Sequence, residues 1–94
     1  MPDEPIATLL EKALAMRLPS FDAQHRAALR LFNGFHEGCA DLAVDLYART
    51  LVLHDYAEAP GQGLALVRGA EAFFRERLPW LGCALVKTRS SPAP

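Results

Sequence analysis

Two runs of alternating side chains, joined by a short connection, constrain the fold of this chain most. Residues 42–47 divide into two sets at every second position: Leu42, Val44 and Leu46 against Ala43, Asp45 and Tyr47. Because successive side chains of a strand point to opposite faces, one face is apolar and the other carries a carboxylate and a phenol. Residues 51–56 repeat the alternation, and residues 48–50 are predicted to be a short hairpin connection.

Apolar residues at helical spacing predict helices on both sides of this hairpin. One helix runs from Ile6 to Arg17 and ends at Pro19. Another follows the Gly- and Pro-containing residues 58–63, with its buried face at Leu64, Val67, Ala70, Phe73, Phe74 and Leu78. A further helical piece is predicted from Phe21 to Arg30, with Ser20 or Asp22 as its N-cap.

The remaining segments complete a small sheet. Alternation begins again at Leu31, residues 37–41 are predicted to be a turn, and residues 83–86 form a short β-rich run. We therefore predict an α+β fold with N-terminal helices, three antiparallel strands, one amphipathic crossover helix and a final strand in a small mixed sheet. Its parts are a helical segment (residues 1–29), an α+β domain (residues 30–89), and a polar tail or the start of a linker (residues 90–94).

Length and charge exclude several classes of protein. A chain of 94 residues can bury one modest core but not a second nucleotide-binding domain. A formal charge of −1 gives no global attraction to nucleic acid or membrane, so a site for a polyanion must be a local patch. No apolar run is long enough to span a membrane, and the two cysteines lack the spacing of metal ligands. We expect a cytoplasmic protein with reduced cysteines.

A pattern of turn and strand residues resembles a known family. Its members here are Arg30, Asn33, Glu37, Gly38, Leu42, Val44, Asp45, Tyr47 and the run Leu51-Val52-Leu53. The pattern is similar to the small α+β domain that precedes the catalytic domain in S-adenosylmethionine-dependent methyltransferases acting on a base of large-subunit ribosomal RNA. The resemblance covers roughly residues 30–89. The segment Gly38-Cys39-Ala40-Asp41 departs from the family, whose turn has a proline and a second glycine.

The resemblance implies an accessory domain rather than a complete enzyme. The cofactor-binding sheet, the Gly-rich loop and the catalytic residues of the family would all lie after Pro94. Within the chain, only Gly61-Gln62-Gly63 suggests a Gly-rich loop, and it lacks a third glycine. We assign no catalytic, cofactor-binding or metal-binding residue, and we expect a partial product that is inactive alone and does not bind S-adenosylmethionine.

Several polar residues allow both a chemical and a structural interpretation. Asp45 beside Tyr47 could serve acid/base chemistry, but a strand carboxylate more often caps turn amides or meets a cross-strand partner. Glu37 and Asp41 could hold a metal, but carboxylates beside a turn commonly accept its N–H groups. The histidines at positions 25, 36 and 54 lack the spacing of ligands. Cys39 lacks the third orienting group that a nucleophile needs.

The candidates for RNA contact are Arg49, Lys87 and Arg89. Arg49 lies at the predicted hairpin tip, and residues 87–89 form a basic stretch without acids. A few cations can position phosphates but do not read sequence, and the alternative is a solvated strand end. Phe73, Phe74 and Trp80 are predicted to be core side chains, although exposed aromatic residues could stack on bases.

Two functional hypotheses follow. The first is an accessory portion of an S-adenosylmethionine-dependent RNA methyltransferase, which positions RNA or packs against a catalytic methyltransferase domain. The second is a stand-alone module for protein–protein interaction, which binds a partner or forms a homodimer.

Overall fold

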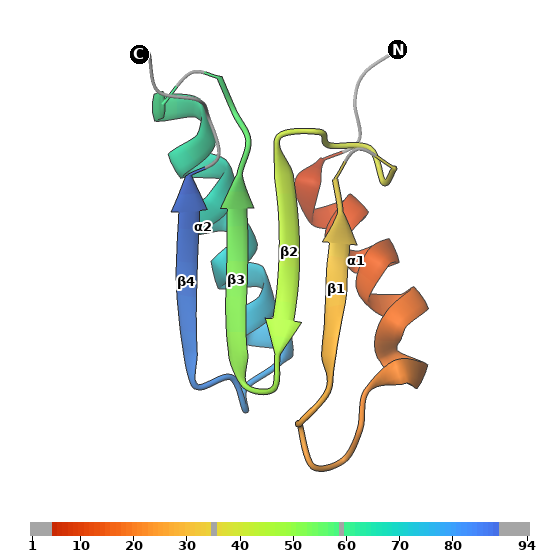
Figure 1. The fold of residues 1–94 in the computed structure, drawn as a ribbon. Coiled ribbons are helices and arrows are strands. Elements are labelled where there is room, and N and C mark those ends of the chain that lie inside the picture. The colour runs from red at the N-terminus through yellow and green to blue at the C-terminus, as the bar shows by residue number, and fades with distance from the viewer. Residues whose placement is uncertain (1–4, 35, 59, 89–94) are drawn as a thin grey trace.

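A four-stranded sheet forms one layer of the molecule and two α-helices form the other (Figure 1). The computed structural model describes residues 5–34, 36–58 and 60–88, with the side chains of residues 60–62 left out. The elements in chain order are α1 (Ile6–Arg17), the 3₁₀ helix η1 (Leu18–Ser20), β1 (Ala28–Asn33), β2 (Leu42–Tyr47), β3 (Thr50–Asp55), α2 (Pro60–Arg77) and β4 (Cys83–Thr88).

The order of the strands in the sheet follows their order in the sequence, β1-β2-β3-β4. The first three strands are antiparallel, whereas β4 runs parallel to β3. Antiparallel neighbours need only a short turn, but a parallel neighbour needs a crossover, which α2 supplies. The predicted fold class, a small mixed α+β sheet with a crossover helix, is confirmed.

The β2–β3 hairpin has the short connection that the sequence predicts. Tyr47 pairs with Thr50, so Ala48 and Arg49 form a two-residue loop. Ala48 has a φ of 56°, in the left-handed region. Two-residue hairpins favour such a conformation at their first central position because it matches the twist of the strands, and glycine adopts it with the least strain.

The helix predicted from Phe21 to Arg30 is wrong. Residues 21–27 form a loop, and β1 already begins at Ala28. Asp22 does accept hydrogen bonds from backbone N–H groups, as an N-cap residue would. Its carboxylate binds the N–H groups of Arg26 at 3.1 Å and Ala27 at 3.3 Å. However, His25 has a φ of 54°, which ends the turn instead of continuing a helix.

The alternation predicted from Leu31 is also interrupted. The register of β1 against β2 shifts between Arg30, which lies opposite Asp45, and Phe32, which lies opposite Val44. Leu31 is the extra residue of this bulge, and both Leu31 and Phe32 are fully buried. The bulge lets two consecutive apolar side chains enter the core, which a regular strand does not allow.

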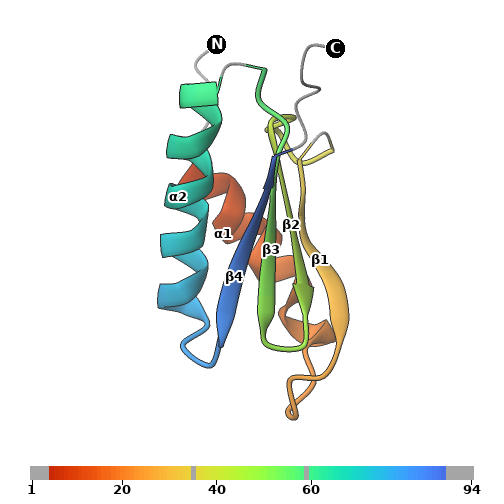
Figure 2. The ribbon, with the colours of Figure 1, turned by 60° about the vertical axis from the view of Figure 1, so that its left-hand side comes forward.

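Both helices cover the same face of the sheet (Figure 2). The core between the layers consists of Leu10, Ala13, Leu14, Leu31, Phe32, Leu42, Val44, Leu46, Leu51, Leu53, Val67, Ala70, Phe74 and Leu78.

Helix α2 begins at Pro60, earlier than predicted, and Leu64 is 49% exposed rather than buried. Phe74 is in the core, and Phe73 and Trp80 are partly buried against it, as predicted. Neither helix in the described ranges is long and apolar enough to cross a membrane.

Candidate nucleic-acid interface

The face of the sheet that the helices leave uncovered carries a cluster of charged and aromatic side chains. Strand alternation places Arg30 of β1, Asp45 and Tyr47 of β2 and His54 of β3 on this open face. Tyr56, directly after β3, joins them, since its ring lies against that of His54 with centroids 6.1 Å apart. We call these five residues the open-face cluster.

Asp45 is the centre of the open-face cluster. Its Oδ1 and Oδ2 accept hydrogen bonds from Nε of Arg30 at 2.7 Å and Nη2 of Arg30 at 3.0 Å, and Oδ2 lies 2.8 Å from Nε2 of His54. Asp45 is 7% exposed and His54 is 6% exposed, although both are on the solvent side of the sheet. The interpretation of Asp45 as a residue with a cross-strand partner is therefore confirmed.

The two partners keep Asp45 ionised. Burial acts to raise the pKa of this carboxyl, but the hydrogen bonds and charges of Arg30 and His54 outweigh it, so the pKa is lowered from its ordinary value of 3.8. The hydrogen bond to Asp45 is the main cause that raises the pKa of Arg30, against the opposite effect of burial. The pair is thus charged at neutral pH, and proton transfer by Asp45 in that range is disfavoured.

Arg30 is oriented by this arrangement. Asp45 uses the Nε and Nη2 side of the planar guanidinium, which leaves the N–H groups of Nη1 and one of Nη2 on the outer edge. The Arg30 side chain is 44% exposed, so this outer edge can reach solvent or a ligand. A guanidinium that a carboxylate fixes in this way presents two parallel donors with the spacing of phosphate oxygens.

Two tyrosines flank the oriented arginine. Tyr47 is 53% exposed and Tyr56 is 43% exposed. A shallow hollow of about 230 Å³ lies between Arg30, Asp45 and Tyr47, together with Ala28 and Leu29. Another of about 250 Å³ lies on the opposite side of Arg30 and is lined by Arg30, Asn33, Gly34, Ala40, Leu42, Ala43 and Tyr56. Each hollow is thus lined by Arg30 and by one exposed tyrosine.

The predicted RNA-contact residues lie in different places. Lys87 is exposed and pairs in register with His54, beside the open-face cluster. Arg49 is at the other end of the β3–β4 pair, where its Nη1 donates to the carbonyl oxygen of Trp80 at 3.4 Å. Arg89 is outside the described residues. The structure does not bring Arg49 and Lys87 together, so they do not form one continuous basic edge.

Glu37 of the family-like pattern has a structural role. Its carboxylate accepts hydrogen bonds from Nη2 of Arg17 at 2.5 Å and from the backbone N–H of Asn33 at 2.7 Å. Burial acts to raise the pKa of Glu37, but these bonds outweigh it and the pKa is lowered from 4.5. Gly38 follows with a φ of 103°, which favours glycine. The connection between β1 and β2 is thereby anchored to α1, as expected of a carboxylate that satisfies turn amides.

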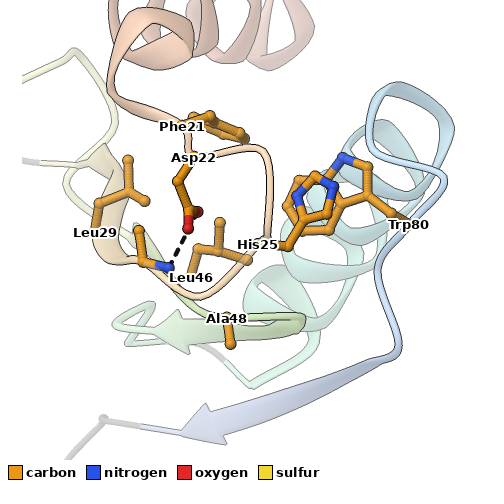
Figure 3. Close-up of a pocket in the computed structure, with 8 residues that line it drawn as sticks. Phe21, Asp22, His25, Leu29, Leu46, Ala48 and Trp80 are labelled. Atoms are coloured by element: carbon orange, nitrogen blue, oxygen red, sulfur yellow. Dashed lines mark hydrogen bonds between the residues drawn. The ribbon is translucent and has the colours of Figure 1, made fainter.

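The aromatic residues of the loop between η1 and β1 pack against Trp80. Figure 3 shows His25 and Trp80 with their rings stacked beside Phe21, and the ring centroids of His25 and Trp80 are 3.9 Å apart. Asp22 lies in the same crevice, where it binds the backbone of the loop. The crevice has no room for a water molecule. It is a packing contact between two loops, in which Trp80 is partly buried against the core.

The glycines at positions 61 and 63 lie in a helix rather than in a Gly-rich loop. Gly61-Gln62-Gly63 belongs to the first turns of the helix, not to a loop after a strand. A Cβ atom at Gly63 would lie 2.1 Å from Oδ1 of Asp55, so the carboxylate of the protein itself occupies the space beside this glycine.

The remaining candidates are the two cysteines and the side chains that could hold a metal. Burial is the main cause that raises the pKa of the Cys39 thiol, which disfavours the thiolate. Cys39 and Cys83 are both free thiols. No group of three or more potential metal ligands occurs among residues 5–34, 36–58 and 60–88.

Sequence reasoning missed the role of His54 and the pairing of Arg30 with Asp45. The signal was present in part, because Asp45, His54 and Tyr56 all occupy the polar positions of alternating strands. The missing information was the register of β1. The bulge at Leu31 sets that register, and no local pattern in the sequence reports it.

Comparisons with known proteins identify relatives in structure only. No model of a protein family matches the chain, and no curated protein matches it in sequence. A solved structure from Streptococcus mutans, provisionally described as a SAM-dependent methyltransferase, matches with a TM-score of 0.69 at 21% identity, over 94% of this chain and 25% of its own. SMU.776, provisionally described as a methyltransferase and crystallised with SAH, matches with a TM-score of 0.64 at 18% identity, over 94% of this chain and 24% of its own. The chain therefore has the fold of about a quarter of each of these proteins.

Proposed function

We propose that this chain is an accessory portion of a SAM-dependent RNA methyltransferase and that it positions RNA on the open face of its sheet. The likeness to about a quarter of two proteins described as methyltransferases supports the first part. The same coverage leaves about three quarters of each of those proteins without a counterpart here. In this proposal the methyl donor and the catalytic groups belong to another part of the complete protein.

One observation carries the RNA part of the proposal: Asp45 holds Arg30 between two exposed tyrosines. Single-stranded nucleic acid is commonly bound by aromatic rings, on which bases stack, and by cations that contact phosphate. A guanidinium suits phosphate because its parallel donors match two oxygens. Lys87, next to His54 in the register, adds a second cation at this face. The overall charge of −1 requires such a local site.

A different surface favours the alternative of a protein-binding module. Leu85 is 52% exposed and Val86 is 49% exposed on β4, which is an edge strand of the sheet. An exposed apolar edge strand can pair with a strand of another chain. This surface fits a catalytic domain, another partner or a second copy of the chain, and Leu85, in register with Val52, shares the open face with the cluster.

The test is a titration of labelled single-stranded RNA with the chain, followed by fluorescence anisotropy at several salt concentrations. We expect affinity to decrease with salt because each cation that contacts a phosphate releases bound counterions. Lys87→Ala should weaken binding and reduce the salt slope by about one. Arg68→Ala is the matched control, since Arg68 is exposed on α2 in the other layer and its loss should leave binding unchanged.

Two results would contradict the proposal. One is the absence of RNA binding at low salt, particularly if sedimentation shows a concentration-dependent dimer, which would favour the alternative. The other is equal loss of affinity in Lys87→Ala and Arg68→Ala. That result would indicate a general effect of charge rather than a site on the open face.

A further inference from the structure

The open-face cluster divides into two half-sites of similar size. Arg30 is a wall of both hollows, whose volumes are about 230 Å³ and 250 Å³. Tyr47 bounds one hollow and Tyr56 bounds the other. Tyr47 is the last residue of β2, whereas Tyr56 follows Asp55, the partner of Leu42 at the start of β2. The two rings are therefore separated by most of the length of the strands, with Arg30 between them.

We propose that this face binds two unpaired nucleobases of a single RNA strand, one against Tyr47 and one against Tyr56, with a phosphate of the intervening backbone on the outer edge of Arg30. The inference rests on the proposed function, because it specifies which form of RNA the same face takes. Bases held inside a duplex do not present their flat surfaces to a side chain, so the site selects single strands.

The chemistry of the three groups supports this ligand. A phenol ring that is about half exposed on a sheet offers a flat apolar surface to any base, whatever its sequence. Asp45 fixes the plane of the Arg30 guanidinium before a ligand arrives, so little conformational entropy is lost on binding. His54 supports Asp45 from the other side at 2.8 Å. Asp45 and His54 are therefore positioning residues in this site.

A stacking contact can be separated from a purely electrostatic one by substitution. Tyr47→Leu and Tyr56→Leu each remove a ring from an exposed position, so both variants should fold. We expect each to weaken binding of single-stranded RNA by about 5- to 150-fold, the range for the loss of one base stack. Tyr47→Phe and Tyr56→Phe keep the rings and should bind within about two-fold of the unchanged chain. Met16→Ala, at a 74% exposed position on α1, is the control for a surface change in the other layer.

The experiment compares single-stranded RNA with an RNA duplex of the same sequence and places the fluorescent base 2-aminopurine in the single strand to report stacking. Tighter binding of the single strand, quenching of 2-aminopurine and loss of both in the Leu variants would support the inference. Equal affinity for duplex and single strand, or Leu variants that bind like the unchanged chain, would overturn it while the proposed RNA-binding function stands. A chain that binds neither RNA would overturn both.

Discussion

Arg30 and Asp45 lie directly opposite each other on β1 and β2 and are joined by two hydrogen bonds of 2.7 and 3.0 Å. Because His54 adds a third bond at 2.8 Å, the carboxylate of Asp45 is satisfied by side chains of two neighbouring strands. The cluster therefore links β1, β2 and β3 on the face that has no helical cover. It contributes to the stability of the sheet and to the shape of the proposed RNA site.

Loss of the Asp45 charge should destabilise the fold moderately. We expect Asp45→Asn to lower the free energy of unfolding by about 1–3 kcal/mol, because His54 and Arg30 lose an ionised acceptor at a mostly buried position. In a double-mutant cycle with Arg30→Ala, the coupling should be about 1 kcal/mol or less, since the Arg30 side chain is 44% exposed and solvent screens the pair. Urea denaturation of the four proteins measures both quantities. An Asp45→Asn variant as stable as the unchanged chain would contradict this role.

Stability should decrease in acid. The pKa values of Asp45 and Glu37 are lowered in the folded chain from ordinary values of 3.8 and 4.5. The unfolded chain therefore takes up protons first, so the stabilisation is complete above these ordinary values and is lost as the pH falls through the folded ones. Urea denaturation between neutral pH and about pH 2 should show this loss.

The control for the pH prediction is the double variant Asp45→Asn and Glu37→Gln. It removes both lowered groups, so its stability should be lower at neutral pH and should vary less with pH in the acid range. If the free energy of unfolding of the variant falls as steeply with decreasing pH as that of the unchanged chain, other carboxylates cause the pH dependence.

Substitution of Gly34 should be severe. A Cβ atom there would lie 1.8 Å from the carbonyl oxygen of Leu42 and 2.3 Å from that of Cys39, and backbone atoms cannot move aside cheaply. We expect Gly34→Ala to destabilise the chain by about 3 kcal/mol or more, seen as a lower urea midpoint. Gly69→Ala is the matched control, because nothing lies within 4 Å of its added atom and alanine is the better helix former. Equal effects of the two changes would contradict the close approach at Gly34.

One substitution in the β2–β3 hairpin should stabilise the protein. Ala48 has a φ of 56°, so Ala48→Gly removes strain and should raise the free energy of unfolding by about 0.5–1 kcal/mol. The same change at Ala65, an exposed position of α2, should instead lower it by about 1 kcal/mol. Thermal unfolding of both variants gives the comparison. Destabilisation by Ala48→Gly would mean that the left-handed conformation carries no strain.

The sequence by itself determined the elements that rest on local patterns. Alternation from Leu42 to Tyr56 predicted the hairpin and the two faces of its strands, because a period of two allows no other placement of the apolar side chains. Helical spacing predicted α1 and most of α2. The β-rich run after α2 predicted the final strand. The polar face of the hairpin could therefore be predicted from the sequence alone.

Only the tertiary structure decided how these elements meet. The capping signal of Asp22 predicted a helix from Phe21 to Arg30. Residues 28–33 of this segment pair with β2 instead, because strand pairing supplies more backbone hydrogen bonds than an isolated helical turn. The bulge at Leu31 then set Arg30 opposite Asp45. Residues 15 positions apart come together through that register alone, and the register is a property of the assembled sheet rather than of any segment.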